Sequence, residues 1–131
     1  MSKRTPGDGW NVYLTGGQNI LELWNGWSVA ISGPTVNNNQ WYHLAVTGSS
    51  SGQKMYLNGV LVGSTNVVVN PSSAATNLTI GVNNDGNSPW FFGGSMKNVR
   101  YWNIELGATQ IQANMTNPVG PQAGLILDFS M

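Results

Sequence analysis

The stretches WYHLAVT (residues 41–47) and KMYLNG (residues 54–59) decide the fold of this chain. Both are short runs rich in apolar, aromatic and β-branched residues, which is typical of β-strands. The second stretch ends in Asn58-Gly59, a pair that favours a two-residue hairpin turn, and it leads directly into Val60-Leu61-Val62. We therefore predict a strand over 41–47 and a hairpin over 54–62.

A two-residue period of apolar residues runs through most of the chain. It is visible at Val12 and Leu14, over 20–24 and over 27–31, and turn residues separate the segments about every ten residues. This pattern predicts an all-β fold, an antiparallel β-sandwich. A helical pattern appears over 106–115, and 125–129 is predicted to be a terminal strand. The positions expected in the core include Val29, Leu44, Val46, Leu57, Ile80, Val99 and Leu127.

Two further stretches, LTIG (residues 78–81) and FGGSMKNVRYWN (residues 92–103), follow in a familiar order. With the region 41–59 and the short turn after 103, they resemble the laminin-G-like branch of the concanavalin A-like lectin/glucanase superfamily. The resemblance implies a jelly-roll sandwich in which LTIG is a strand. It also implies that Trp41, His43 and Trp102 are structural residues.

The chain departs from the family pattern at its N-terminus. Members usually carry further strands before the region that matches 9–24, but here only eight polar residues precede it, and we expect residues 1–8 to be a flexible N-terminus. The domain is therefore either a minimal sandwich that lacks N-terminal strands or one whose missing strands come from a neighbouring chain.

Length and composition fit one domain, residues 1–131. Charged residues make up 8% of the chain and the formal net charge is zero, so we expect no nucleic-acid partner. No apolar run is long enough for membrane insertion, and no signal peptide is visible. Cysteine is absent from the sequence, which excludes disulfides and thiol chemistry. Localisation stays unassigned, with a virion surface as one option.

We predict that the protein is not an enzyme. Glycan hydrolases of the resembling superfamily carry an E-x-D-x-x-E set of carboxylates, and glycoside hydrolysis needs two acids at a controlled separation. The acids here are Asp8, Glu22, Asp85, Glu105 and Asp128, and no two have that spacing. Glu22 is expected to be an exposed strand position. His43 is the only histidine, and no nucleophile motif accompanies it.

Six tryptophans give a different signal, because alternating strands cannot bury all of them. Glycan sites pair an aromatic platform with amide and carboxylate groups. The loop 83–90 offers Trp90 as platform and Asn84, Asp85 and Asn87 as polar contacts; the alternative is an Asn/Gly-rich turn with a packed tryptophan. Trp24 and Trp27, which flank the turn at 25–26, form a second candidate site. The alternative interpretation is that the two rings pair across the strands and stabilise the hairpin.

Calcium is a further expectation that the resemblance implies. Relatives often hold it at a loop rim, and Asp85 and Asn83, with neighbouring amides, could supply part of a shell. Calcium takes about six to eight oxygen ligands, commonly with more than one carboxylate. A single carboxylate in this loop predicts weak binding.

Two functional classes follow. The first is a non-catalytic, lectin-like recognition module for adhesion, whose partner is a glycan or a protein surface. The second is a structural or decorating component of a viral or phage particle, which packs against other subunits. The second class would make the chain part of a homo-oligomer or larger assembly.

Overall fold

The first layer of the fold is a four-stranded antiparallel sheet. In the computed structural model, which describes residues 2–5, 8–68, 77–83, 89–116 and 119–129, the strands follow the order β1-β2-β3-β4. The alternating pattern of the sequence produces this layer, because apolar positions of β3 face the interior. Its strands are β1 (Ser2–Thr5), β2 (Asp8–Leu14), β3 (Ile20–Asn25) and β4 (Ser28–Thr35).

Strand β1 corrects the prediction for the N-terminus. Residues 1–8 were expected to be flexible and to contribute no strand, but Ser2–Thr5 pairs antiparallel with β2 from Asp8 to Asn11. The sequence Ser-Lys-Arg-Thr has no apolar alternation that would signal a strand. Backbone groups make the pairing, so the strand forms without such a signal.

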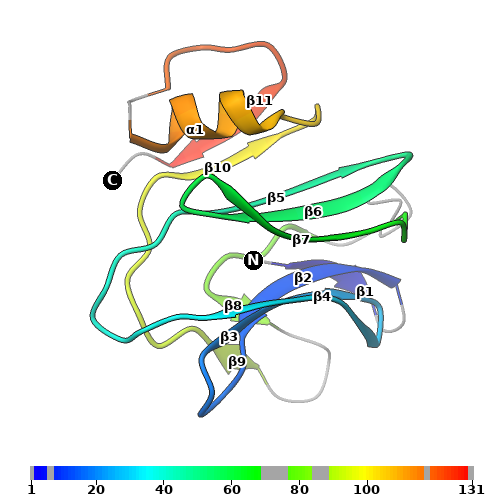
Figure 1. The fold of residues 1–131 in the computed structure, drawn as a ribbon, viewed down its shortest axis with the longest axis vertical. Helices are drawn as coiled ribbons and strands as arrows, with labels where there is room; N and C mark the ends of the chain where they lie inside the picture. The colour runs from blue at the N-terminus through cyan, green and yellow to red at the C-terminus, as the bar shows by residue number, and fades with distance from the viewer. Residues whose placement is uncertain (1, 6–7, 69–76, 84–88, 117–118, 130–131) are drawn as a thin grey trace.

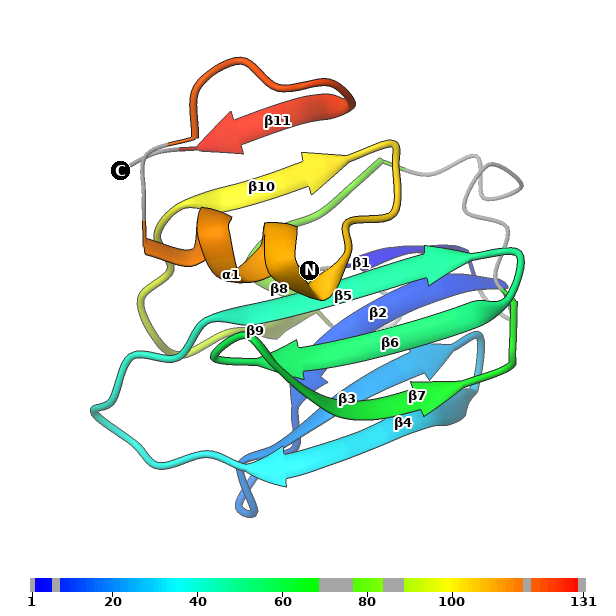
Figure 2. The same cartoon turned by 45° about the horizontal axis from the view of Figure 1, so that its top comes forward.

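The second layer consists of β5 (Leu44–Ser49), β6 (Gly52–Leu57) and β7 (Val60–Thr65), in that spatial order. The predicted hairpin is confirmed: Asn58 has φ 50° and Gly59 has φ 76°, the positive values that a tight hairpin turn requires. Figures 1 and 2 show this green layer beside the blue sheet, with the connection 36–43 joining them at the left.

The C-terminal half adds two short strand pairs and one helix. Strand β8 (Val82–Asn83) pairs with β9 (Trp90–Phe91), and β10 (Val99–Trp102) pairs with β11 (Leu125–Phe129). Helix α1 (Ala108–Thr116) packs near β10 (Figure 2). The helical segment and the terminal strand are thus confirmed.

The strand expected over 78–81 is displaced along the chain. In this region only Thr79 forms an isolated bridge, and the strand β8 begins at Val82. Gly81 has φ 76°, a left-handed conformation that interrupts an extended strand. The LTIG stretch therefore precedes β8.

The core lies between the two layers. Leu21, Leu23 and Ile31 from the first sheet pack with Val36 and with Met55 of β6, and Leu23 and Met55 are fully buried. The edges β4 and β7 also approach each other. A side chain at Gly63 of β7 would collide with Ile31, so glycine permits this contact. A second cluster places Leu106 and Ile111 against Tyr56, on the side of the sheet that α1 covers.

The predicted core is correct in part. Leu44, Val46 and Leu57 are partly buried and pack against the main cluster, and Ile80, Val99 and Leu127 are half-buried. The prediction that Val29 lies in the core is wrong, because its side chain is 43% exposed. Leu23 pairs with Ile31 but the adjacent Trp24 pairs with Val29, so a β-bulge at Ala30 breaks the alternation. No helix in the described ranges is long and apolar enough to cross a membrane.

Candidate functional site

The β8–β9 hairpin presents three consecutive aromatic side chains to solvent. Trp90 is 69% exposed, Phe91 is 76% exposed and Phe92 is 40% exposed. The hairpin holds them through its own backbone, since Trp90 pairs with Asn83 and Phe91 with Val82. The Phe92 N–H also donates a hydrogen bond to the Gly81 carbonyl oxygen, at 2.9 Å. We call Asn83, Trp90, Phe91 and Phe92 the aromatic hairpin surface.

Pairing places Trp90 and Asn83 on one face of this hairpin. Side chains of directly opposite residues in an antiparallel pair share a face, and successive residues alternate. Phe91 therefore faces the other side, together with Val82. The Asn83 Oδ1 atom is buried and accepts no hydrogen bond, which leaves an amide acceptor unsatisfied beside the exposed ring.

The polar half of the predicted site stays a prediction. Asn84, Asp85 and Asn87 lie outside the residues that the structure describes. Of the residues predicted to contact a sugar in this loop, the structure describes the platform, Trp90; beside it lies Asn83, which was predicted as a calcium ligand. The exposure of Trp90 favours the platform interpretation over the packed tryptophan that was the alternative.

The described residues do not by themselves form a calcium shell. Asn83 Oδ1 is an orphaned oxygen of the right chemistry, but Asp85 falls outside the described residues, and no group of three His, Cys, Asp or Glu gathers within the described ranges. One amide oxygen is far from the six to eight oxygens, roughly, that calcium takes. No step of the proposed function depends on the metal.

The second predicted site, Trp24 and Trp27 across a turn at 25–26, is not a shared platform, and the turn itself lies one residue later, at 26–27. Trp24 is half-buried, and its ring lies against Tyr13 of β2 with centroids 5.7 Å apart. Its Nε1–H donates a 2.7 Å hydrogen bond to Glu22. Trp27 lies in the turn and is 59% exposed. The Trp24 ring is thus packed against the sheet, whereas the Trp27 side chain is exposed at the turn.

Trp41 is a surface residue that sequence analysis missed. The expectation of a structural role holds for Trp102, which packs beside Tyr56 and Leu106. It is wrong for Trp41, whose side chain is 57% exposed and carries the Lys97 ammonium 4.7 Å from its ring centroid. The run Asn37-Asn38-Asn39-Gln40 before Trp41 was an available signal, because it pairs amides with an aromatic ring as the loop 83–90 does.

His43 and Glu22 show no catalytic arrangement. The backbone N–H of His43 donates to Asn58 Oδ1 at 2.9 Å, and the His43 Nδ1 atom is buried without a hydrogen-bond partner. Burial lowers the pKa of His43, and the positive charge of Arg100 lowers it further. The Glu22 carboxylate accepts the hydrogen bond from Trp24, which gives it a structural role.

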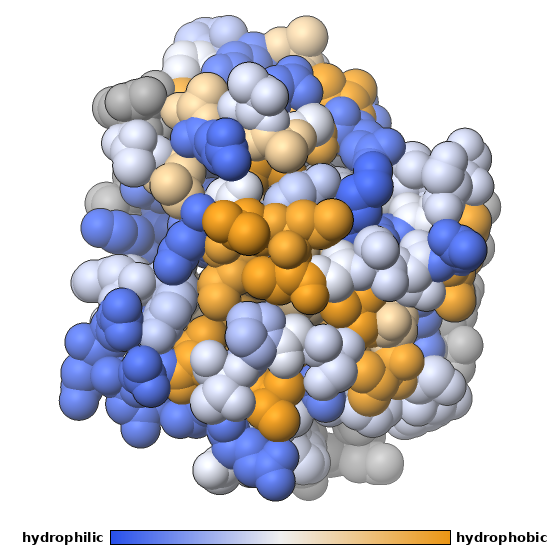
Figure 3. Space-filling model, viewed as in Figure 1, coloured by the Kyte–Doolittle hydropathy of each residue, from blue (hydrophilic) through white to orange (hydrophobic). Residues whose placement is uncertain are grey.

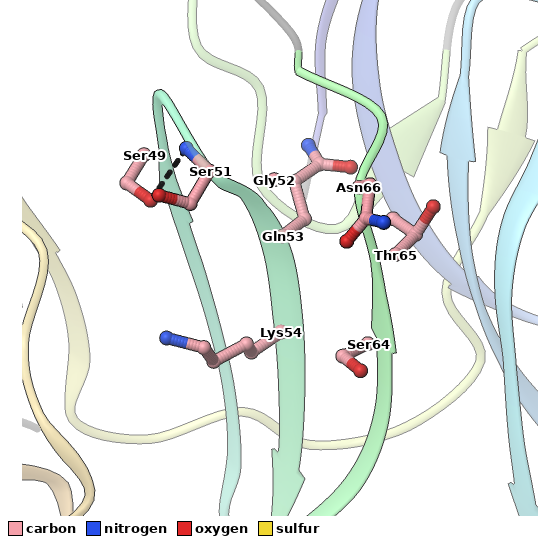
Figure 4. Close-up of a pocket in the computed structure, with 8 residues that line it drawn as sticks. All are labelled: Ser49, Ser51, Gly52, Gln53, Lys54, Ser64, Thr65 and Asn66. Carbon is pink, nitrogen blue, oxygen red and sulfur yellow. Dashed lines mark hydrogen bonds between the residues drawn. The ribbon is translucent and has the colours of Figure 1, made fainter.

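A polar pocket lies at the opposite end of the second layer from the turn 58–59. Figure 4 shows it at the β5–β6 turn, where Ser51 N–H donates to Ser49 Oγ at 3.2 Å. Glu105 holds the Lys54 ammonium at 3.0 Å, and this hydrogen bond raises the pKa of Lys54 and lowers that of Glu105. The pocket lacks an aromatic platform; it is lined by Ser49, Ser51, Gly52, Gln53, Lys54, Ser64, Thr65 and Asn66.

Comparisons with known proteins agree with this architecture. The chain is similar in structure to an S-layer domain-containing protein (residues 221–444) from Clostridium thermocellum ATCC 27405, with a TM-score of 0.56 and 19% sequence identity. The match covers 85% of this chain but 64% of that one, and it shows a shared fold. No curated protein matches the sequence. The family model for the concanavalin A-like lectin/glucanases superfamily matches residues 1–112, so the chain belongs to this superfamily.

Proposed function

We propose that the domain is a non-catalytic recognition module that binds glycans through the aromatic hairpin surface. The observation that carries this proposal is Trp90, a tryptophan 69% exposed on a short hairpin with the amide of Asn83 on the same face. Contiguous exposed aromatic side chains, here Trp90, Phe91 and Phe92, are a feature of interaction sites, and a sugar ring offers a complementary C–H face.

The electrostatics of the chain suit a sugar ligand. Five basic and five acidic residues cancel, and a glycan needs hydrogen bonds and stacking rather than a strong field. Membership of the superfamily supports a binding role. The S-layer domain in the name of the similar structure supports a place at a surface, and adhesion there is the biological role that we propose.

The non-enzyme assignment rests on how the candidate acids are used. Glu22 is hydrogen-bonded to Trp24, Asp128 is paired with Arg100 and Glu105 is paired with Lys54. A retaining or inverting hydrolase needs one acid with a raised pKa and one free carboxylate facing the substrate. Incubation with polysaccharides should therefore release no reducing ends, and turnover that Glu22→Gln abolishes would overturn the assignment.

A matched pair of tryptophan variants tests the site. A glycan array should identify ligands of the wild-type chain, and Trp90→Ala should weaken their affinity by about 1 to 3 kcal/mol, the value of burying one large aromatic surface. Trp27→Ala is the control, because Trp27 is similarly exposed but lies on another turn. Both variants should keep the wild-type melting temperature. Binding that survives Trp90→Ala but is lost in Trp27→Ala would move the site to the β3–β4 turn.

The second candidate function is subunit packing in a particle. Figure 3 shows an apolar patch at the centre of one face, over the start of β7, where Val60 is 62% exposed and Leu61 is 51% exposed. An apolar hollow also lies between Leu78 and the β10–β11 pair. Light scattering tests this function. A defined oligomer that Val60→Lys dissociates, together with a silent glycan array, would favour the particle component over the lectin.

A further inference from the structure

We propose that Trp41 and Lys97 form a second sugar-binding surface, specific for an acidic sugar residue such as a uronic or sialic acid. The inference rests on the proposed role in glycan recognition, but it assigns a different surface and adds a requirement for negative charge on the ligand. Trp41 lies in the connection 36–43 and Lys97 in the connection 92–98, both at the left of Figures 1 and 2.

The first argument is that the fold holds the Trp41 ring in the open. Its neighbour Tyr42 packs against the core, and the Tyr42 hydroxyl accepts the Asn37 N–H at 3.1 Å and donates to Gln40 Oε1 at 2.9 Å. Asn19 anchors the same connection, since its carbonyl oxygen accepts the Val36 N–H at 2.9 Å and its side chain donates to Asn38 at 3.1 Å. A ring that is exposed on an anchored segment loses little entropy on binding.

The second argument is the charge on the ring. The Lys97 ammonium lies 4.7 Å from the Trp41 centroid, within the range of a cation–π contact, and the ring is still 57% exposed. Lys54 and Arg100 each bind a carboxylate, at 3.0 Å and 3.3 Å. Within the described residues, Lys97 makes no such ion pair. The aromatic platform therefore carries a positive charge that no carboxylate of the described chain neutralises.

The third argument concerns which ligand satisfies all these groups. A pyranose ring covers an indole with its C–H face, its hydroxyls suit the exposed amides of Asn37, Asn39 and Gln40, and a carboxylate on the sugar suits the ammonium. A single lysine is a point charge that fits one carboxylate. Nucleic acid would need several phosphate contacts, and the chain has no net positive charge.

Matched acidic and neutral probes test the inference on the whole chain. Trigalacturonate and its methyl ester share one sugar backbone, and the ester replaces each carboxylate by a neutral methyl ester; sialyllactose and lactose differ by one acidic sugar. In indole NH spectra of the ¹⁵N-labelled protein, at least one acidic probe should shift the Trp41 signal, and its neutral partner should shift that signal at least tenfold less at equal concentration. Raising NaCl from 0.05 to 0.5 M should weaken the effect, because salt screens the ion pair.

Variants separate this surface from the aromatic hairpin surface. Lys97→Gln should lower the affinity for the acidic probe at least tenfold, Lys97→Arg should retain most of it, and Trp90→Ala should not change it. Equal Trp41 shifts with charged and neutral probes, an unchanged affinity at Trp41 in Lys97→Gln, or no Trp41 shift with either acidic probe would overturn the inference. An equal Trp41 shift with hexaglutamate would also overturn it, because the surface would then recognise acidic peptide. If neutral glycans prove not to bind at Trp90, the results expected at Trp41 and Lys97 stay the same, so the two proposals can fail independently.

Discussion

Arg100 is the side chain that joins the C-terminal elements. Its Nε lies 3.3 Å from Asp128 Oδ1 on β11, and its Nη1 donates a 2.7 Å hydrogen bond to the Asn114 carbonyl oxygen of α1. The Arg100 side chain is 7% exposed and that of Asp128 is 20% exposed. Water screens such a pair less than it screens a fully exposed ion pair.

Removal of Arg100 should therefore destabilise the domain strongly. Arg100→Met leaves the Asp128 carboxylate and the Asn114 carbonyl oxygen without this donor, and we expect the free energy of unfolding to fall by about 3 kcal/mol. Urea denaturation measures this change. The double variant Arg100→Met/Asp128→Leu should recover part of the loss, because it also removes the carboxylate that has lost its Arg100 partner. A double variant as unstable as the sum of the two single variants would contradict an energetic coupling between them.

His43 should make stability depend on pH. Burial, with the Arg100 charge, lowers its pKa below the ordinary value of 6.5, so the unfolded chain binds a proton before the folded chain does. Stability is therefore complete above pH 6.5 and is lost as the pH falls from there through the folded pKa. Denaturation at pH 7.5 and 5.5 should show this loss, and His43→Gln should reduce it. An equal pH dependence in both proteins would contradict the assignment to His43.

Among the elements, the β6–β7 turn is coupled to α1. The Gln112 side chain donates to the Gly59 carbonyl oxygen at 3.1 Å, and a Cβ at Gly59 would lie 2.8 Å from Gln112 Cγ. Gly59 and Gly81 share φ 76°, but a Cβ at Gly81 would meet nothing within 4 Å. The two glycines therefore share the backbone strain that alanine would introduce and differ in the collision.

Alanine at Gly59 and at Gly81 should separate the cost of backbone strain from the cost of the collision with Gln112. Gly81→Ala should lower the free energy of unfolding by about 1 to 2 kcal/mol, because an L-residue is strained at this φ. Gly59→Ala should cost about 1 kcal/mol more, because Gln112 must move and lose its hydrogen bond. Equal losses for the two variants in urea denaturation would show that the contact between the turn and α1 contributes nothing.

Sequence pattern was informative about elements whose cause is local. The Asn58-Gly59 turn could be predicted because positive φ at two successive residues is encoded by the pair itself. Strand β1 could not, because its polar residues carry no alternation that would signal the backbone pairing with β2. The bulge at Ala30 also escaped prediction, since it arises from the pairing of Leu23 and Trp24 with β4 and moves Val29 to the surface.

The candidate site was predictable to a similar extent. The exposed position of Trp90 could be predicted from composition, since an aromatic ring beside amides in a turn is the combination that sugar sites use. Asn83 was predicted only as a calcium ligand, and its pairing with Trp90 depends on the hairpin register. Trp41 was missed because its position in a family motif suggested that it packs in the core. The sequence does not show which of the adjacent rings, Trp41 or Tyr42, enters the core. Tyr42 does so, and Trp41 is left outside.

For the domain as a whole, two of the three exposed tryptophans of the described residues, Trp41 and Trp90, have different chemical neighbours and lie outside the core. Trp90 has an amide neighbour on its hairpin, whereas Trp41 carries a lysine. The core clusters contain neither ring, so either can be changed without opening the sandwich. We therefore expect Trp90→Ala and Trp41→Ala to change ligand binding with little change in melting temperature.

The central claim, that neutral glycans bind at Trp90, is tested most directly by the tryptophan indole NH signals of the ¹⁵N-labelled chain. The neutral glycan with the strongest array signal is titrated in, and single Trp→Phe variants assign the six signals. The account predicts a saturable shift that is largest at Trp90 and negligible at Trp24 and Trp102, which are held within the sheets. A saturable shift confined to Trp27, or none at Trp90 under conditions where the glycan is bound, would contradict it.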